Sequence, residues 1–100
     1  MFSDIQKEAL ENLGRRLRDA RLSRNDPQKE FAFRIGVSIP TLHKMEQGSP
    51  TVSLGAWVKA LWVLNRLEDL DGLLAPRQSL FDQLDAMEKN RPRQRARRRT

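Results

Sequence analysis

The stretch PQKEFAFRIGVSIPTLHKMEQG, residues 27–48, decides the fold. Gly36 interrupts it, because glycine adopts backbone conformations that other residues reach only with strain. Ser38 is a favourable N-cap for a helix, and Gly48 is a favourable stop after one. Ala32 is small enough to let two helices approach closely. The pattern therefore predicts two short helices joined by a tight turn at Gly36.

Helical spacing continues upstream of this stretch, and no segment shows the alternation typical of a strand. Asp26 is expected to cap the helix that follows it, with Pro27 as the first helical residue. Leu42 and Met45 are expected to face the core. A longer first helix is predicted by an apolar stripe with steps of three and four residues, namely Leu10, Leu13, Leu17 and Ala20.

Further helical segments are expected downstream. Ser53 suits the N-cap of a fourth helix, and Val58 and Trp62 lie off its apolar side. That apolar side comprises Leu54, Trp57, Leu61 and Leu64. A fifth short helix is suggested by Leu67, Leu70, Leu73 and Leu74.

These patterns predict an all-α chain. A five-helix domain is expected in residues 1–75, a short amphipathic helix or linker in 76–90, and a disordered arginine-rich tail in 91–100. Two short helices joined by a tight turn and packed on a longer one describe a helix-turn-helix unit. A plain three-helix packing module is the alternative.

The charge of the chain is unevenly distributed. Residues 1–65 hold ten Lys/Arg against seven Asp/Glu, and residues 66–90 hold three against six. The last ten residues hold six arginines and no acid. Such a tail suits polyanions or acidic protein surfaces. A tail that only keeps the protein in solution is the alternative.

Several classes of protein are disfavoured by the composition. The chain has no cysteine, and its one histidine, His43, cannot form a metal site by itself. Nothing resembles a signal peptide, and the longest apolar stretches are too short to span a bilayer. No nucleophile–base arrangement or phosphate-cradling glycine loop is present. We therefore expect a cytoplasmic protein that is not an enzyme and needs no cofactor or metal.

Three segments, PQKEFAFRIGVS, TLHKMEQG and SLGAWVKAL, resemble the Xre/Cro/C1-type helix-turn-helix domain of bacterial and phage repressors. The similarity covers roughly residues 13–73. It implies a lambda-repressor-like DNA-binding domain of five helices, which acts as a homodimer on double-stranded DNA at an inverted-repeat operator. Within that family the chain is most similar to HipB-type members, which are encoded beside HipA-type kinase toxins. This second resemblance rests on GSPTVSLGAWVKALWVL, on LEDLDGLLAP and on the arginine-rich end.

The resemblance implies that the second and third helices hold the DNA-contacting residues. Gln28 matches a position that meets a backbone phosphate, and a local cap contact is its alternative role. Thr41 matches another phosphate position. His43 is implied at the groove edge, with a solvent-exposed or packed histidine as the alternative. The full set is Gln28, Ser38, Ile39, Pro40, Thr41, His43 and Lys44.

Three of these residues match positions that face base edges. Lys44 alone can donate to guanine acceptors in the major groove. Ile39 can press on thymine methyl groups, and Pro40 is tolerated because first-turn N–H groups have no helical partner. Other family members use glutamine or arginine there. Specificity is therefore expected to depend on methyl contacts, Lys44 and DNA shape.

Arg21 and Glu46 match a family pair that forms an ion pair beneath the DNA-facing surface. An exposed tryptophan is a good interface anchor, so dimerisation through the fourth and fifth helices is predicted, and burial under the C-terminal segment is the alternative. Candidate dimer or partner residues are Val58, Trp62, Leu80, Phe81 and Leu84. Nonspecific polyanion contacts are assigned to Arg91, Arg93, Arg95, Arg97, Arg98 and Arg99.

The sequence thus favours a dimeric repressor that regulates its own operon and binds a HipA-type kinase toxin from that operon. One alternative is a free-standing, phage-like repressor. Another is a protein-interaction module with vestigial DNA binding, which Ile39 and Pro40 favour. RNA binding through the tail is weakened by the lack of stacking aromatic residues.

Overall fold

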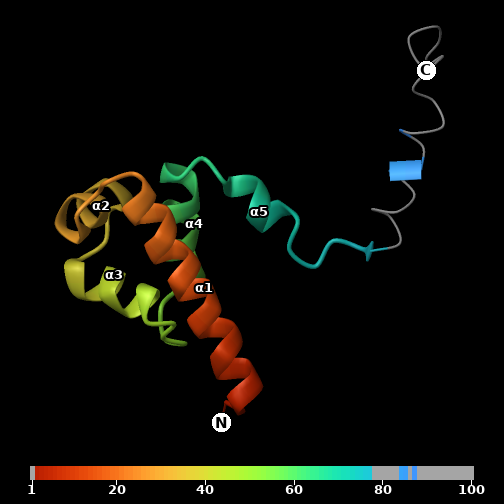
Figure 1. The fold of residues 1–100 in the computed structure, drawn as a ribbon, viewed down its shortest axis with the longest axis horizontal. Coiled ribbons are helices and arrows are strands. Elements are labelled where there is room, and N and C mark those ends of the chain that lie inside the picture. Colours follow the sequence, from red (N-terminus) through yellow and green to blue (C-terminus); the bar gives the residue numbers. More distant parts are fainter. Residues whose placement is uncertain (1, 78–83, 86, 88–100) are drawn as a thin grey trace, which may run out of the picture. The chain divides into compact units, whose positions relative to one another are not determined.

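The computed structural model describes residues 2–77, 84, 85 and 87. Among these residues no strand occurs, so the predicted all-α, five-helix fold is confirmed (Figure 1). The chain divides into two units after Leu70, and the packing described below lies within the first. The helices are α1 (Asp4–Ser23), α2 (Gln28–Ile35), α3 (Ile39–Glu46), α4 (Leu54–Val63) and α5 (Leu67–Asp71).

The turn between α2 and α3 is built by Gly36. This residue has a φ of 75°, in the left-handed region that favours glycine. Val37 donates its backbone N–H to the carbonyl of Ala32 at 3.0 Å, which closes the end of α2. Ser38 then caps α3, because its Oγ accepts the backbone N–H of Thr41 at 3.2 Å. The glycine turn and the serine cap are confirmed.

The core is formed where α1, α2, α3 and α4 meet. In the first unit α3 packs against α1 and α2, and α4 packs against α2. Trp57 is partly buried against this core, as predicted. Each large buried side chain contributes about 1.5–3 kcal/mol relative to exposure. The buried hydrophobic residues are Leu17, Phe31, Ala32, Ile35, Leu42, Met45, Ala56 and Ala60.

The buried stripe of α1 differs from the predicted one. Gly14, Leu17 and Arg21 are buried, whereas Leu13 is 40% exposed. A Cβ on Gly14 would lie 2.5 Å from the carbonyl oxygen of Glu46, so the glycine lets α1 touch the end of α3. The leucine pattern failed here because close helix approach requires a small residue rather than a large apolar one.

The N-terminal part of α1 was also missed. The helix begins at Asp4 because Ser3 and Gln6 form a capping box. The Ser3 Oγ accepts the N–H of Gln6 at 3.2 Å, and the Ser3 N–H donates to Gln6 Oε1 at 3.0 Å.

The apolar side of α4 needs a similar correction. Ser53 caps the helix as predicted, by accepting the N–H of Ala56 at 3.1 Å. The buried residues are Ala56 and Ala60, whereas Leu54 is 63% exposed. The buried side of α4 thus consists of small side chains, which permit close packing of helices.

The fifth helix is shorter than the leucine pattern suggested. It ends at Asp71, so Leu73 and Leu74 lie beyond it and are exposed.

Asp26 does not cap α2, contrary to prediction. Pro27 occupies the N-cap, outside the helix. The buried carboxylate of Asp26 instead accepts Arg24 Nε and Arg34 Nη1, each at 3.0 Å. Two guanidinium donors satisfy this carboxylate better than a first-turn N–H group would. Asp26 therefore ties the end of α1 to α2.

Several predicted features lie outside the described residues. These are most of the amphipathic segment 79–89, with Leu80 and Phe81, and the arginine tail 91–100. Leu84 is described and is 60% exposed.

Replacing Ser38 by alanine is expected to lower the free energy of unfolding by about 1 kcal/mol, because the Thr41 N–H loses its acceptor. Urea unfolding followed by circular dichroism measures this loss. Ser38→Asp is the control, since an aspartate also accepts at the N-cap. Equal losses in both variants would contradict a capping role.

Candidate nucleic-acid interface

One face of α3 is free of core contacts. Leu42, Met45 and Glu46 point inward and are buried. At 100° per residue the other side of the helix presents the predicted Pro40, His43 and Lys44, and also Gln47, while the predicted Ile39 lies at its edge, next to Glu46. All five of these are exposed, Ile39 by 44%. A bare helix face of this kind has the width to enter the major groove of DNA.

The donors on this face are few. Lys44 has an ammonium group that reaches acceptors on guanine, whereas Ile39 and Pro40 offer only apolar surface. Gln47, which the sequence did not single out, carries an amide that can both donate and accept. The sequence feature that could have identified Gln47 is its position four residues after His43, which places the two side chains on the same face.

The hydroxyls of Ser38 and Thr41 are bonded to each other. Ser38 Oγ donates to Thr41 Oγ1 at 2.9 Å while accepting the Thr41 backbone N–H. The Thr41 hydroxyl therefore keeps its own hydrogen for an outside acceptor such as a phosphate oxygen. Ser38 acts mainly as the cap that holds this hydroxyl in place.

A buried ion pair lies beneath the face. Arg21 of α1 donates from Nε to Glu46 Oε2 at 2.5 Å and from Nη2 to Glu46 Oε1 at 3.1 Å. The side chains of the two residues are 7% and 2% exposed. Arg21 also donates from Nη1 to the carbonyl of Asp26 at 2.8 Å. The pair implied by the resemblance is present, and it fixes α1 against α3.

Gln28 joins this network from the first turn of α2. Its Nε2 donates to Glu46 Oε1 at 3.0 Å, so the amide holds a local contact within the protein. The amide has a second N–H, which forms no hydrogen bond within the part of the chain that the structure describes. Pro27, at the N-cap, has no side-chain acceptor, so the first N–H groups of α2 remain suited to an anion. The phosphate role of Gln28 stays a prediction.

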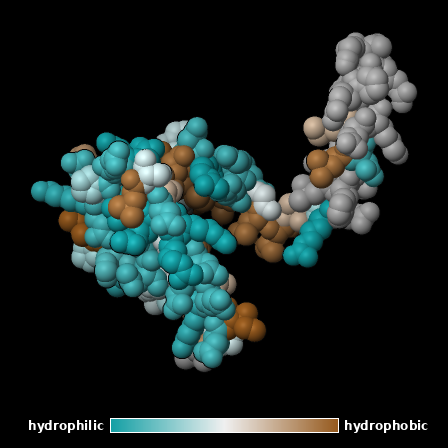
Figure 2. Space-filling view, in the orientation of Figure 1, coloured by the Kyte–Doolittle hydropathy of each residue, from teal (hydrophilic) through white to brown (hydrophobic). Residues whose placement is uncertain are grey.

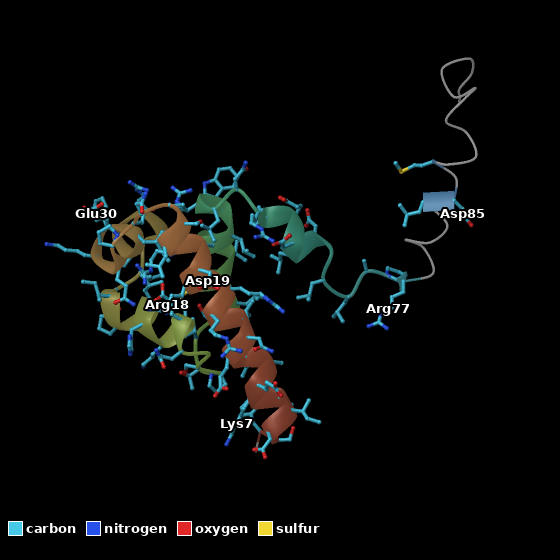
Figure 3. The ribbon with its side chains drawn as sticks, in the orientation of Figure 1. Lys7, Arg18, Asp19, Glu30, Arg77 and Asp85 are labelled. Atoms are coloured by element: carbon cyan, nitrogen blue, oxygen red, sulfur yellow. The ribbon has the colours of Figure 1, made fainter. Side chains whose placement is uncertain are left out.

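A polar groove of about 720 Å³ runs beside α3. Arg15 and Arg18 of α1 line it, and Figure 3 shows Arg18 on the α3 side of α1. Arg18 precedes Arg21 by three residues and so lies on the same face of α1. The complete lining is Glu11, Arg15, Arg18, Arg21, Gln28, His43, Glu46 and Gln47.

The sequence model of a helix-turn-helix domain matches residues 12–71, which is more than half of the chain. The chain belongs to the helix-turn-helix domain family. Such a unit implies DNA binding. No curated protein and no solved structure matched the chain.

A second exposed surface of this helix-turn-helix domain lies on α4. Trp62 is 71% exposed and Val58 is partly buried. The two residues line a shallow groove of about 280 Å³, together with two cationic residues, Arg34 and Lys59. The other lining residues are Ile35, Val63 and Leu67.

Two further findings concern only the described part of the chain. Its helices include none that is both long and apolar enough to cross a membrane. Its His, Asp and Glu side chains do not gather in groups of three or more that could hold a metal ion.

Proposed function

We propose that this helix-turn-helix protein is a sequence-specific, cytoplasmic transcriptional repressor that regulates its own operon. The observation that carries the proposal is the bare face of α3, which lies beside a groove containing Arg15 and Arg18. In the proposal a homodimer places two copies of α3 in successive major grooves of an inverted-repeat operator.

The residues divide into positioning and reading groups. Arg15, Arg18 and Gln28 contact backbone phosphates, and so does the Thr41 hydroxyl. These contacts set the register of α3 but carry no sequence information. Recognition of the operator sequence depends on three residues and on DNA deformability. Lys44 donates to guanine, whereas Ile39 and Pro40 contact thymine methyl groups.

The narrower proposal makes the protein a HipB-type antitoxin, or antitoxin-associated subunit, that binds a HipA-type kinase toxin. The exposed Trp62 supports a protein partner, because a large aromatic side chain anchors interfaces well. Arg34 and Lys59 at the rim suit an acidic partner surface. Trp62→Ser is expected to weaken the complex with the purified kinase from the same operon, and to leave operator binding unchanged.

One observation favours a second function, a protein-interaction module with vestigial DNA binding. Ile39 and Pro40, at the start of α3, offer no side-chain hydrogen bond to a base. A free-standing, phage-like repressor differs from the main proposal only in having no toxin gene in its operon. The presence or absence of a kinase-like reading frame beside the gene distinguishes the two.

Lys44→Ala is expected to weaken binding to the chain's own upstream DNA by about 1–3 kcal/mol and to reduce the preference over a scrambled duplex. Arg18→Ala is expected to weaken binding to both duplexes alike and to lower the log–log salt slope by about 0.9. Fluorescence anisotropy titrations over a salt series measure both effects.

Arg66→Ala is the control, since Arg66 is an exposed cation that pairs with Asp69 and lines the groove between α1 and α4 rather than the one beside α3. It should leave affinity and preference unchanged. Unaltered operator binding in both Lys44→Ala and Gln28→Ala would refute the reading role of α3 and favour the interaction module.

A further inference from the structure

The first half of α1 extends beyond the helices that pack against the rest of it. α1 is 20 residues long, yet its buried residues begin only at Gly14. Figure 1 shows this end projecting past α3. The projection is a formed helix rather than a frayed end, since Ser3 and Gln6 cap it.

An apolar stripe runs along the projecting end. Phe2 is 46% exposed, Ile5 80% and Leu13 40%, and Ala9 between them is exposed too. The steps of four residues place Ile5, Ala9 and Leu13 on one side of the helix, whereas Phe2 precedes the helix and lies beside Lys7 and Leu10. Lys7 projects from the opposite side (Figure 3). Figure 2 shows a hydrophobic spot on this otherwise hydrophilic end.

The stripe continues into a groove of about 650 Å³ between α1 and α4. Leu13 belongs to both features, so the apolar surface is continuous from the N-terminus toward the body of the domain. Arg16 stands at the edge of the groove. The apolar lining of the groove comprises Leu13, Leu17, Ala20, Trp57, Leu61 and Leu64.

The charges of α1 are separated along its length. Residues 4–11 carry three acids and one lysine, whereas residues 15–24 carry five arginines and one acid. Of these arginines, Arg21 pairs with Glu46, Arg24 pairs with Asp26, and Arg15 and Arg18 line the groove beside α3. Arg16 stands beside Leu13 at the edge of the apolar stripe, and Glu8 lies next to Ala9 toward the other end. Two copies of α1 lying antiparallel bring Glu8 of each against Arg16 of the other. A parallel arrangement sets like charges together. The helix is thus complementary to itself in one direction only, as an interface with two-fold symmetry requires.

We propose that α1 pairs with α1 of a second copy in antiparallel orientation. Glu8 of each copy faces Arg16 of the other, which places the two-fold axis near Asn12. In this register Ala9 lies beside Leu13 of the other copy, and Ile5 lies level with Ala20 at the edge of its groove. This inference rests on the proposed dimeric repressor and names the surface that makes its dimer.

The Trp62 surface, which the sequence favoured for dimerisation, is less suited to self-association. Its rim carries Lys59 together with Arg34, which is already paired with Asp26, so two copies placed face to face bring their lysines together. That surface is left for a different partner.

Sedimentation equilibrium of the full chain, without DNA, tests the pairing by charge exchange. Glu8→Arg and Arg16→Glu are each expected to raise the dimer dissociation constant at least 10-fold, because each sets like charges together twice across the two-fold axis. An equimolar mixture of the two variants is expected to regain the wild-type dimer constant, since every contact is then between opposite charges. The double variant is expected to regain it as well. Both positions are exposed, so circular dichroism should show unchanged helix content.

Trp62→Ser is the control, and it should dimerise like the wild type. The α1 pairing would be overturned if neither charge change altered the dimer dissociation constant, or if Trp62→Ser abolished the dimer. Either result would leave the repressor proposal intact. Failure of the mixture to recover would overturn it also. A wild-type chain that stays monomeric would overturn both the pairing and the dimeric repressor.

Discussion

Replacing Glu46 by alanine is expected to lower the free energy of unfolding by about 3–5 kcal/mol. The change leaves the guanidinium of Arg21 in a site where its side chain is only 7% exposed and its main partner is gone. Gln28 loses its acceptor in the same step. Because small domains are stable by about 5–15 kcal/mol in total, this single change removes a large share.

The large loss of unfolding free energy is expected because the ion pair is buried, and two controls test this cause. Asp69→Ala breaks the exposed pair between Arg66 and Asp69, and should cost less than about 1 kcal/mol. Replacing both buried partners, Arg21→Met with Glu46→Leu, should cost less than Glu46→Ala alone, since no buried charge is left without a partner. Urea unfolding measures all three variants. A loss of under 1 kcal/mol for Glu46→Ala would show that the buried pair contributes little.

Replacing Gly48 by alanine is the other change with a large expected effect, about 2–5 kcal/mol. Gly48 has a φ of 79°, which costs an L side chain roughly 1–2 kcal/mol. Its new Cβ would also lie 2.7 Å from the backbone of Leu10 and of Glu11. Backbone atoms cannot rotate away as a side chain can, so the start of α1 must shift, which adds about 1–3 kcal/mol.

Gly36→Ala separates the two causes. Gly36 has a similar φ of 75°, but a Cβ there would meet only the Nζ of Lys59, at 3.9 Å. This variant should therefore cost only the conformational part, about 1–2 kcal/mol. Equal losses at the two glycines, measured by thermal or urea unfolding, would contradict the close contact between Gly48 and α1.

The sequence predicted most of the helix caps and turns correctly. The cap residues Ser38 and Ser53 and the turn glycines Gly36 and Gly48 depend on a few neighbouring backbone groups, which the sequence displays directly. The caps and turns lie where they were expected. Asp26 was the exception, because its partners include Arg34, eight residues away on the next helix.

The buried stripes were predicted less well. Counting large apolar residues favoured Leu13 and Leu54, whereas packing selected Gly14, Ala56 and Ala60. How closely two helices approach is a property of the pair, and one helix pattern does not contain it.

The candidate DNA surface was likewise predictable from the sequence only in part. The exposed face of α3 could be read from helical spacing, and the Arg21–Glu46 pair from the family resemblance. Arg15 and Arg18 were missed because charged residues around a helix look equivalent until packing decides which of them face a groove. Three of their neighbours in that groove, Gln28, His43 and Glu46, come from α2 and α3 and are ten or more residues away in sequence.

The measurement that tests the central claim most directly is a salt-series titration of the full chain on its own upstream DNA, beside a scrambled duplex. Each neutralised phosphate should contribute about 0.9 to the log–log slope on both duplexes. A repressor that reads bases through α3 should keep its preference for the native duplex as salt rises, because base contacts release few counterions. Equal and steeply salt-sensitive binding to both duplexes would contradict it and would assign the binding to nonspecific phosphate contacts.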